Sequence, residues 1–225
     1  KEAKWILAEG SDAAAMSRSI PLEKVLDDVL IALYQNGERI RPEQGYPMRL
    51  VVPGWEGNIN IKWLRRIKVT KFPTHTKDET SKYSDLLPNG KSLQFTFPME
   101  VKSVITQPSA GSKLLKKGPT HITGLAWSGF GKIIKVEIST DKGKTWKLAI
   151  LEGNNQPLAP VRFRFIWNWE GQECSLQSRA TDSSKNKQPI RSEWSKQYGL
   201  GQMYHNNSIQ SWRITPKGQI INEYV

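Results

Sequence analysis

Residues 45–69, GYPMRLVVPGWEGNINIKWLRRIKV, place two apolar segments on either side of a glycine-rich turn. The apolar segments predict a strand before the turn and another after it, and Gly54 and Gly57 suit the turn itself. A hairpin that only filled a core would not need a cluster of cations beside its turn. Such a cluster follows the turn and consists of Lys62, Arg65, Arg66 and Lys68. The segment therefore predicts an anionic group nearby.

The residues before this segment predict a strand and a helix. Residues 5–8 are apolar and end at the polar turn 9–12, which is typical of a short strand. Residues 17–38 predict a helix, because Ser19 could cap it, Pro21 is tolerated in a first turn and Asn36-Gly37 would stop it. The apolar side chains of this helix recur at helical spacing and are expected to lie in the core: Leu22, Val25, Leu26, Val29, Leu30 and Leu33.

The composition changes after a polar loop at residues 74–92. From about residue 95, short alternating segments separated by turn residues predict an all-β region. The predicted strands are residues 101–107, 122–127, 133–139, 146–151, 161–169 and 173–182, with a hairpin turn at Asp141-Lys142-Gly143. Their number and spacing favour an immunoglobulin-like sandwich. We therefore expect two domains, residues 1–92 and residues 93–225.

Composition restricts the possible partners. The 225 residues include 33 Lys and Arg against 21 Asp and Glu, a net charge of +12 that favours anionic partners. No nucleic-acid-binding motif accompanies the charge, so we expect no nucleic-acid partner, although a basic nucleic-acid-binding sandwich stays open as an alternative. No apolar run reaches the roughly 18 residues of a membrane span. A single cysteine excludes an internal disulfide, and His75, His121 and His205 lack the spacing of a zinc site.

Longer segments resemble a known family. SIPLEKVLDDVLIALYQNGERIRPEQGYPMRLVVPGWEGNINIKWLRRI, residues 19–67, resembles the second half of the molybdenum-cofactor domain of the sulfite oxidase family. PMEVKSVITQPSAG, ITGLAWSGFGKIIKVEISTDKGKTW and NNSIQSWRI resemble the C-terminal dimerisation domain of that family. Within the family, RPEQGYPMRLVVPGWEGN and DETSKYSDLLPNG are most similar to the molybdenum subunit of bacterial sulfane or sulfite dehydrogenases. The implied fold is the C-terminal part of an α+β molybdopterin domain followed by an all-β immunoglobulin-like sandwich.

The resemblance implies a set of residues that bind the molybdenum-molybdopterin cofactor. Gln44 stands where the family usually has a histidine that touches the pterin, and its amide could still donate and accept hydrogen bonds. Arg49 matches the arginine that contacts the pterin or its phosphate, a suitable role for a charged planar fork of donors. The segment Asn60, Ile61 and Lys62 matches the one that holds the cofactor through backbone amides and a lysine. Asp12 matches an acidic contact, across an alignment gap.

Two further positions would face the substrate. Tyr83 matches a tyrosine that lines the substrate pocket, and Lys132 stands where many members carry an arginine that reaches the oxyanion substrate. The cysteine with which the family attaches molybdenum lies in a part of the domain to which nothing here corresponds. We expect Cys174 to be a small core residue of a strand and assign no metal ligand. Because the chain begins at KEAKWILAEG, without an initiating Met or signal peptide, we expect it to begin within a domain.

The implied function is that of the C-terminal portion of a molybdenum-dependent sulfite or sulfane dehydrogenase. Such an enzyme oxidises an anionic inorganic or protein-bound sulfur substrate and passes electrons to a c-type cytochrome, in the periplasm. The resemblance also implies a homodimer formed through the C-terminal domain. The alternative is a non-catalytic dimerisation or interaction module that lacks the metal-ligating half of the domain.

Overall fold

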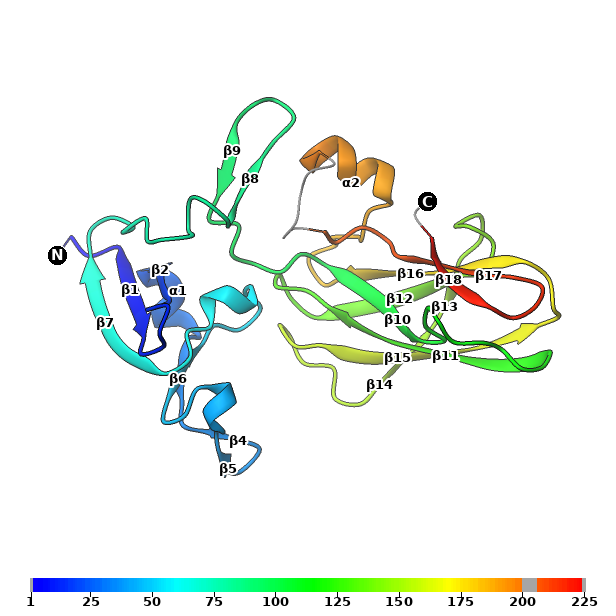
Figure 1. Ribbon diagram of the computed structural model, residues 1–225, viewed down its shortest axis with the longest axis horizontal. Helices are drawn as coiled ribbons and strands as arrows, with labels where there is room; N and C mark the ends of the chain where they lie inside the picture. Colours follow the sequence, from blue (N-terminus) through cyan, green and yellow to red (C-terminus); the bar gives the residue numbers. More distant parts are fainter. Residues whose placement is uncertain (1, 200–205, 224–225) are drawn as a thin grey trace. The chain divides into compact units, whose positions relative to one another are not determined.

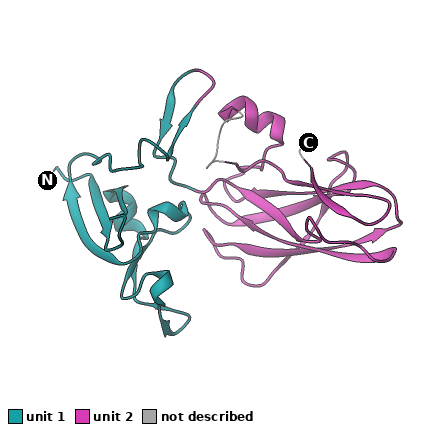
Figure 2. Ribbon diagram, in the orientation of Figure 1, with its two compact units in different colours: residues 1–86, 90–98 teal, residues 87–89, 99–225 magenta. Residues whose placement is uncertain are grey.

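The structure is a computed structural model that describes residues 2–199 and 206–223 (Figure 1). The chain divides into two compact units (Figure 2). Unit 1 comprises residues 1–86 and 90–98, and unit 2 comprises residues 87–89 and 99–225. Among the described residues, no helix is both long enough and apolar enough to cross a bilayer.

Unit 1 is built on a three-stranded antiparallel sheet in the order β2-β1-β7. The strands are β1 (Trp5–Gly10), β2 (Ser17–Pro21) and β7 (Leu64–Thr70). The predicted strand at residues 5–8 is thereby confirmed, and it extends to Gly10. Side chains from this sheet and from the segments around it form one core, which contains Ile6, Ala8, Ile20, Leu50, Val52, Ile59, Ile61 and Leu64.

The predicted helix at residues 17–38 is wrong in most of its length. Helix α1 covers only Leu22–Asp27, and the segment before it is strand β2, in which Ser19 pairs with Leu7 instead of capping a helix. Sheet pairing with β1 therefore overrides local helix propensity in this segment. Of the predicted core stripe, Leu22, Val25 and Val29 pack against the core. The other three side chains, Leu26, Leu30 and Leu33, are exposed.

After α1 the chain forms short strands. These are β3 (Leu30–Ala32), β4 (Tyr34–Gln35), β5 (Glu38–Arg39) and β6 (Arg49–Val51), with a 3-10 turn η1 (Pro42–Gln44) before β6. The β4–β5 hairpin turns at Asn36-Gly37, where both residues have positive φ, so the predicted turn is confirmed. The two strands predicted around the turn at 54–57 are also present, but β6 pairs with β3 and β7 pairs with β1. The turn itself contains a second 3-10 turn, η2 (Gly57–Ile59).

The loop predicted at residues 74–92 contains a small hairpin. Strand β8 (Ser84–Leu86) pairs with β9 (Ser92–Gln94). The preceding residues are anchored by Glu79, which is buried and accepts hydrogen bonds from the amide and hydroxyl of Ser19 and from the amide of Thr76. A buried carboxylate with several donors ties this polar segment to β2, which composition alone could not indicate.

Unit 2 contains two antiparallel sheets. The four-stranded sheet has the order β10-β11-β15-β14 and the five-stranded sheet has the order β13-β12-β16-β17-β18. Their strands are β10 (Lys102–Gln107), β11 (Gly118–Trp127), β12 (Ile133–Ser139), β13 (Lys147–Leu148), β14 (Ile150–Glu152), β15 (Val161–Trp169), β16 (Cys174–Asp182), β17 (Ser211–Ile214) and β18 (Ile220–Glu223).

Most predicted strands of this region are confirmed, with one correction. The segment 146–151 forms two short strands in different sheets, because the chain passes from β13 beside β12 to β14 beside β15. The sequence also gave no indication of β17, β18 or the helix α2 (Arg191–Tyr198). The region after residue 95 is therefore mostly but not entirely β.

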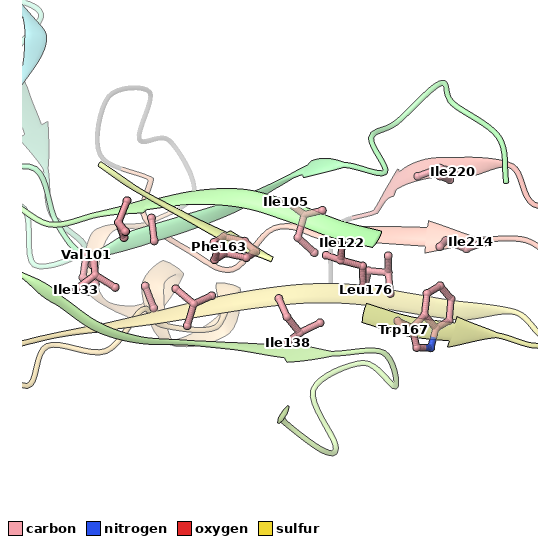
Figure 3. Packing of buried hydrophobic residues seen from close by; sticks show 14 of the residues in the cluster. Val101, Ile105, Ile122, Ile133, Ile138, Phe163, Trp167, Leu176, Ile214 and Ile220 are labelled. Carbon is pink, nitrogen blue, oxygen red and sulfur yellow. The ribbon is translucent and has the colours of Figure 1, made fainter. Parts of the chain in front are cut away.

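Both sheets of unit 2 contribute to one apolar core. Ile105, Ile122 and Phe163 come from the four-stranded sheet, and Ile138 and Leu176 come from the five-stranded sheet (Figure 3). The packing is close at Gly124 of β11, where an added Cβ would lie 2.2 Å from both the Phe163 ring and the Val104 carbonyl oxygen. Glycine is required there because the strand passes directly over an aromatic ring.

Candidate functional site

Arg49 lies at the start of β6 and connects two neighbouring loops of unit 1. Its Nη1 donates to the carbonyl oxygen of Gln44 at 3.1 Å, and its Nη2 donates to that of Asn60 at 3.3 Å. The Nε atom is buried and has no hydrogen-bond partner among residues 2–199 and 206–223. Burial lowers the pKa of the guanidinium from its usual value. Arg49 thus links the backbone of Gln44 to that of Asn60, and its Nε is the nitrogen left without a hydrogen bond in the described residues.

The segment 60–62 follows η2 and is held by its own hydrogen bonds. The side chain of Asn60 accepts from the amide of Val52 at 2.8 Å and donates to the carbonyl oxygen of Glu56 at 2.9 Å. The amide of Ile61 donates to Ile59, and its side chain is buried in the core. The side-chain amide of Asn60 and the backbone amide of Ile61 therefore bond within the protein and shape the turn.

Lys62 lies at the surface beside η1. Its Nζ donates to the carbonyl oxygen of Glu43 at 2.6 Å. Two glycines permit this approach, since an added Cβ would lie 2.7 Å from the Lys62 carbonyl oxygen at Gly10 and 3.0 Å from the Lys62 Cα at Gly45. Gly45 also has φ of 112°, which disfavours any other residue. The backbone around Lys62 is thus enclosed by two positions that tolerate only glycine.

A pocket of about 390 Å³ opens next to this segment. Its lining includes Asp12, Tyr46 and Trp63. Asp12 accepts a hydrogen bond from the amide of Met16 at 2.9 Å, which fixes the turn between β1 and β2. The indole of Trp63 donates to the carbonyl oxygen of Pro42 at 2.9 Å. Asp12, Gln44, Arg49 and the segment 60–62 therefore all belong to unit 1, with Asp12 on the pocket wall.

Two of the cations in the opening segment have an internal partner. Arg65 Nε and Arg66 Nη2 donate to the two carboxylate oxygens of Glu9 at 2.6 and 2.7 Å. The hydrogen bonds from Arg65 and then Arg66 hold the pKa of Glu9 below its usual value. The net charge of the predicted cation cluster is therefore smaller than the sequence suggested, because Arg65 and Arg66 share one carboxylate that lies 56 and 57 residues away and offsets part of their charge.

Tyr83 lies in a second pocket of unit 1, beside a buried arginine that sequence reasoning missed. The guanidinium of Arg18 lies over the Tyr83 ring, with its carbon 4.7 Å from the ring centroid. Asn58, Phe95 and Phe97 line the same pocket. Arg18 is 1% exposed, although a charged residue in the polar stretch SRS gave no sign of burial. Only its place in β2, opposite the buried Ala8 of β1, puts it on the core face.

Lys132 belongs to unit 2, in the turn between β11 and β12. Its amide donates to the hydroxyl of Ser183 at 3.2 Å, and its carbonyl oxygen accepts from the amide of Ser183 at 2.7 Å. The residue itself is exposed. These bonds fix the backbone of the turn and leave the ammonium group at the surface of unit 2.

Cys174, at the start of β16, packs against the core of unit 2. Burial raises the pKa of its thiol to about 11, so the thiolate form that binds metals is disfavoured. No cluster of three or more His, Cys, Asp or Glu side chains within the described residues could hold a metal ion. His205 lies outside the described residues.

Comparison with protein families gives two matches. Residues 1–77 match the oxidoreductase molybdopterin binding domain, and residues 94–212 match the Mo-co oxidoreductase dimerisation domain. The first match contains Asp12, Gln44, Arg49 and the segment 60–62, and the second contains Lys132.

Related proteins agree with these matches. The mitochondrial sulfite oxidase of Mus musculus is 32% identical over 90% of this chain and 41% of its own length. An NADH nitrate reductase of Brassica napus is 31% identical over 82% of this chain and 24% of its own length. The chain thus spans less than half the length of these relatives.

A solved structure matches the whole chain. The sulfane dehydrogenase SoxCD from Paracoccus pantotrophus aligns with a TM-score of 0.97 and 46% identity, covering 100% of this chain and 58% of the other. Together with the two family matches, this similarity identifies the chain as a member of the sulfite oxidase family of molybdenum-cofactor oxidoreductases.

Proposed function

We propose that this chain is the C-terminal portion of a molybdenum-dependent dehydrogenase that oxidises sulfite or a sulfane sulfur. In this proposal, residues 1–92 hold one side of the molybdenum-molybdopterin cofactor and residues 93–225 form an immunoglobulin-like dimerisation domain. The similarity to sulfite oxidases and to a sulfane dehydrogenase supports the substrate class. A c-type cytochrome would accept the electrons, and the periplasm would be the compartment.

The observation that carries the proposal is the unused donor of Arg49. A buried guanidinium nitrogen without a partner is costly, so such a donor commonly serves a ligand. The group to be held is a pterin with a phosphate, and both accept hydrogen bonds in the geometry that guanidinium supplies. Arg49 is bonded to Asn60, and the pocket lined by Asp12, Tyr46 and Trp63 opens next to the segment 60–62, so this part of unit 1 suits an anionic heterocycle.

The other residues would assist in different ways. The backbone carbonyl oxygens of Gln44 and Asn60 accept hydrogen bonds from Arg49 and so hold its guanidinium in place. Lys62 supplies an exposed ammonium for a negative charge, while Ile61 anchors the segment in the core. When bound, the cofactor supplies the redox chemistry and the transfer of a water-derived oxygen to sulfur.

Tyr83 and Lys132 are proposed to act on the substrate. The Tyr83 hydroxyl would donate a hydrogen bond to an oxygen of the sulfur anion. Lys132 would attract the anion by charge, with less geometric control than the arginine of other family members because an ammonium lacks a planar fork.

Pterin content tests the role of Arg49. The purified protein would be oxidised in acid, and the fluorescent pterin released per chain would be measured for wild type, Arg49→Met and Arg162→Met. Arg162 is an exposed arginine of unit 2 and serves as the matched control. We expect Arg49→Met to lower pterin content about tenfold or more, as for loss of a charge-assisted hydrogen bond, and Arg162→Met to leave it unchanged. Equal pterin in wild type and Arg49→Met would refute this role.

The second candidate is a non-catalytic interaction module. It is favoured by exposed apolar side chains on unit 1, among them Leu26, Ile67, Val69 and Phe72. Such residues are common where another polypeptide covers a surface. Sedimentation analysis combined with pterin analysis discriminates the two functions, because both allow a dimer and only the first requires bound pterin. A stable dimer that contains no pterin at any stage of purification would favour the module.

A further inference from the structure

Arg18 is a charge buried in the core of unit 1 that the cofactor site does not use. It is among the largest side chains with less than 2% exposure, and its strand neighbours on the same face are Ile20, Ile6 and Ala8. Burying a cation is unfavourable unless its environment compensates for the lost water.

The contacts of Arg18 fix its plane. Nε donates to the side-chain oxygen of Asn58 at 3.1 Å, and Nη1 donates to the carbonyl oxygen of Ser17 at 2.7 Å. Nη2 is buried and has no hydrogen-bond partner in the described part of the chain. The amide nitrogen of Asn58 in turn donates to Glu56 at 2.8 Å, so Asn58 itself is held in one orientation.

The guanidinium of Arg18 lies over an aromatic ring. Its carbon lies 4.7 Å from the centroid of Tyr83, within the range of a cation–π contact. Glu79 lines the same pocket, and its carboxylate oxygens accept hydrogen bonds from the amides of Ser19 and Thr76. The ring of Tyr83 is thus one of the groups that stabilise this desolvated cation, and a desolvated cation–π contact is stronger than an exposed one.

We propose that Arg18 is a positioning residue for Tyr83. The guanidinium holds the face of the ring and thereby fixes the direction of the phenol hydroxyl. Because Arg18 is almost fully buried, it acts through Tyr83 and does not contact the substrate. The importance of this role for catalysis rests on the proposed function, in which Tyr83 faces the sulfur anion.

Nitration of Tyr83 measures this contact in the full chain without any cofactor. Tetranitromethane modifies exposed tyrosine rings, and the tryptic peptide of residues 83–91 reports Tyr83 by mass. The variants are Arg18→Met, which removes the charge, and Arg18→Lys, which keeps a cation. Arg39→Met is the control, since Arg39 lies 5.8 Å from the exposed ring of Tyr34 and belongs to the same unit.

We expect Arg18→Met to raise the nitration rate of Tyr83 by about threefold or more, because one face of the ring loses its cover. Arg18→Lys should restore most of the protection, and Arg39→Met should leave Tyr83 unchanged. Equal rates in wild type and Arg18→Met, or equal rates in Arg18→Lys and Arg18→Met, would overturn the proposal. If Arg18→Met does not fold, Asn58→Ala tests the same point, since loss of the Nε acceptor should also raise nitration of Tyr83 and an unchanged rate would overturn it.

The nitration experiment and the pterin measurement test the two proposals independently. Protein without pterin but with protection of Tyr83 that depends on Arg18 would contradict the proposed function and leave the contact intact. Normal pterin content with unchanged nitration would contradict the positioning role alone.

Discussion

Asp141 shows how a single carboxylate stabilises a hairpin of unit 2. Its oxygens accept hydrogen bonds from the hydroxyl and amide of Thr145 and from the hydroxyl of Ser139, at 2.6, 2.9 and 2.7 Å. These bonds, those from Thr145 first, lower the pKa of Asp141 from 3.8 to about 2. The sequence predicted the turn from Asp-Lys-Gly, but the network depends on side-chain directions that a turn motif does not specify.

The pKa of Asp141 predicts a pH-dependent stability difference. Because the folded-state pKa is lowered, the ionised group stabilises the fold fully above about pH 4, and this contribution is lost as the pH falls through about 2. Asp141→Asn should therefore lower the free energy of unfolding in urea at pH 7 by about 1 kcal/mol, the usual value of lost hydrogen bonds.

The same measurement at low pH provides the contrast. The difference between wild type and Asp141→Asn should shrink toward zero near pH 2, whereas Glu170→Gln, at an exposed position of unit 2, should match wild type throughout. A difference that is as large at pH 2 as at pH 7 would contradict this assignment.

Strand β2 and helix α1 show why local patterns failed in unit 1. The spacing of Leu22, Val25 and Leu26 is compatible with a helix, and a helix does begin at Leu22. The residues before it pair with β1, and that pairing depends on a partner strand which the local sequence does not reveal. Arg18 was missed for the same reason, since strand pairing, and not charge, determines its burial. In unit 2 the segments of β10, β12, β15 and β16 are separated by turn residues and could be predicted from the sequence, whereas β17 and β18 were not predicted.

The boundary between β2 and α1 predicts different effects on stability for truncation of two apolar side chains, one in each element. Ile20 of β2 is 0% exposed and Leu26 of α1 is 77% exposed. Ile20→Ala should lower the free energy of unfolding by about 2–5 kcal/mol, as for buried aliphatic residues. Leu26→Ala should change it by less than about 0.5 kcal/mol, because an exposed leucine loses little packing. Urea unfolding followed by circular dichroism measures both. If Leu26→Ala lowered the free energy of unfolding as much as Ile20→Ala, the originally predicted helix with Leu26 in the core would be favoured instead.

The candidate site was predictable only in part. The residues proposed to bind the cofactor were chosen by their resemblance to a family motif, and all of them belong to unit 1. The pairing of Arg65 and Arg66 with Glu9 was not predictable, because it depends on which strand lies beside β7. A count of cations in a sequence therefore overstates the charge available to a ligand whenever distant carboxylates are folded against them.

For the molecule as a whole, the proposed function makes this chain part of a molybdenum enzyme. The most direct measurement is the molybdenum content per chain, by elemental analysis of the native assembly isolated with its associated polypeptides and with the intact mass of the chain verified. We expect about one molybdenum per chain, as one cofactor per site requires. Molybdenum at background level in an intact, folded assembly would contradict the proposed function, and the interaction module would then be the better assignment.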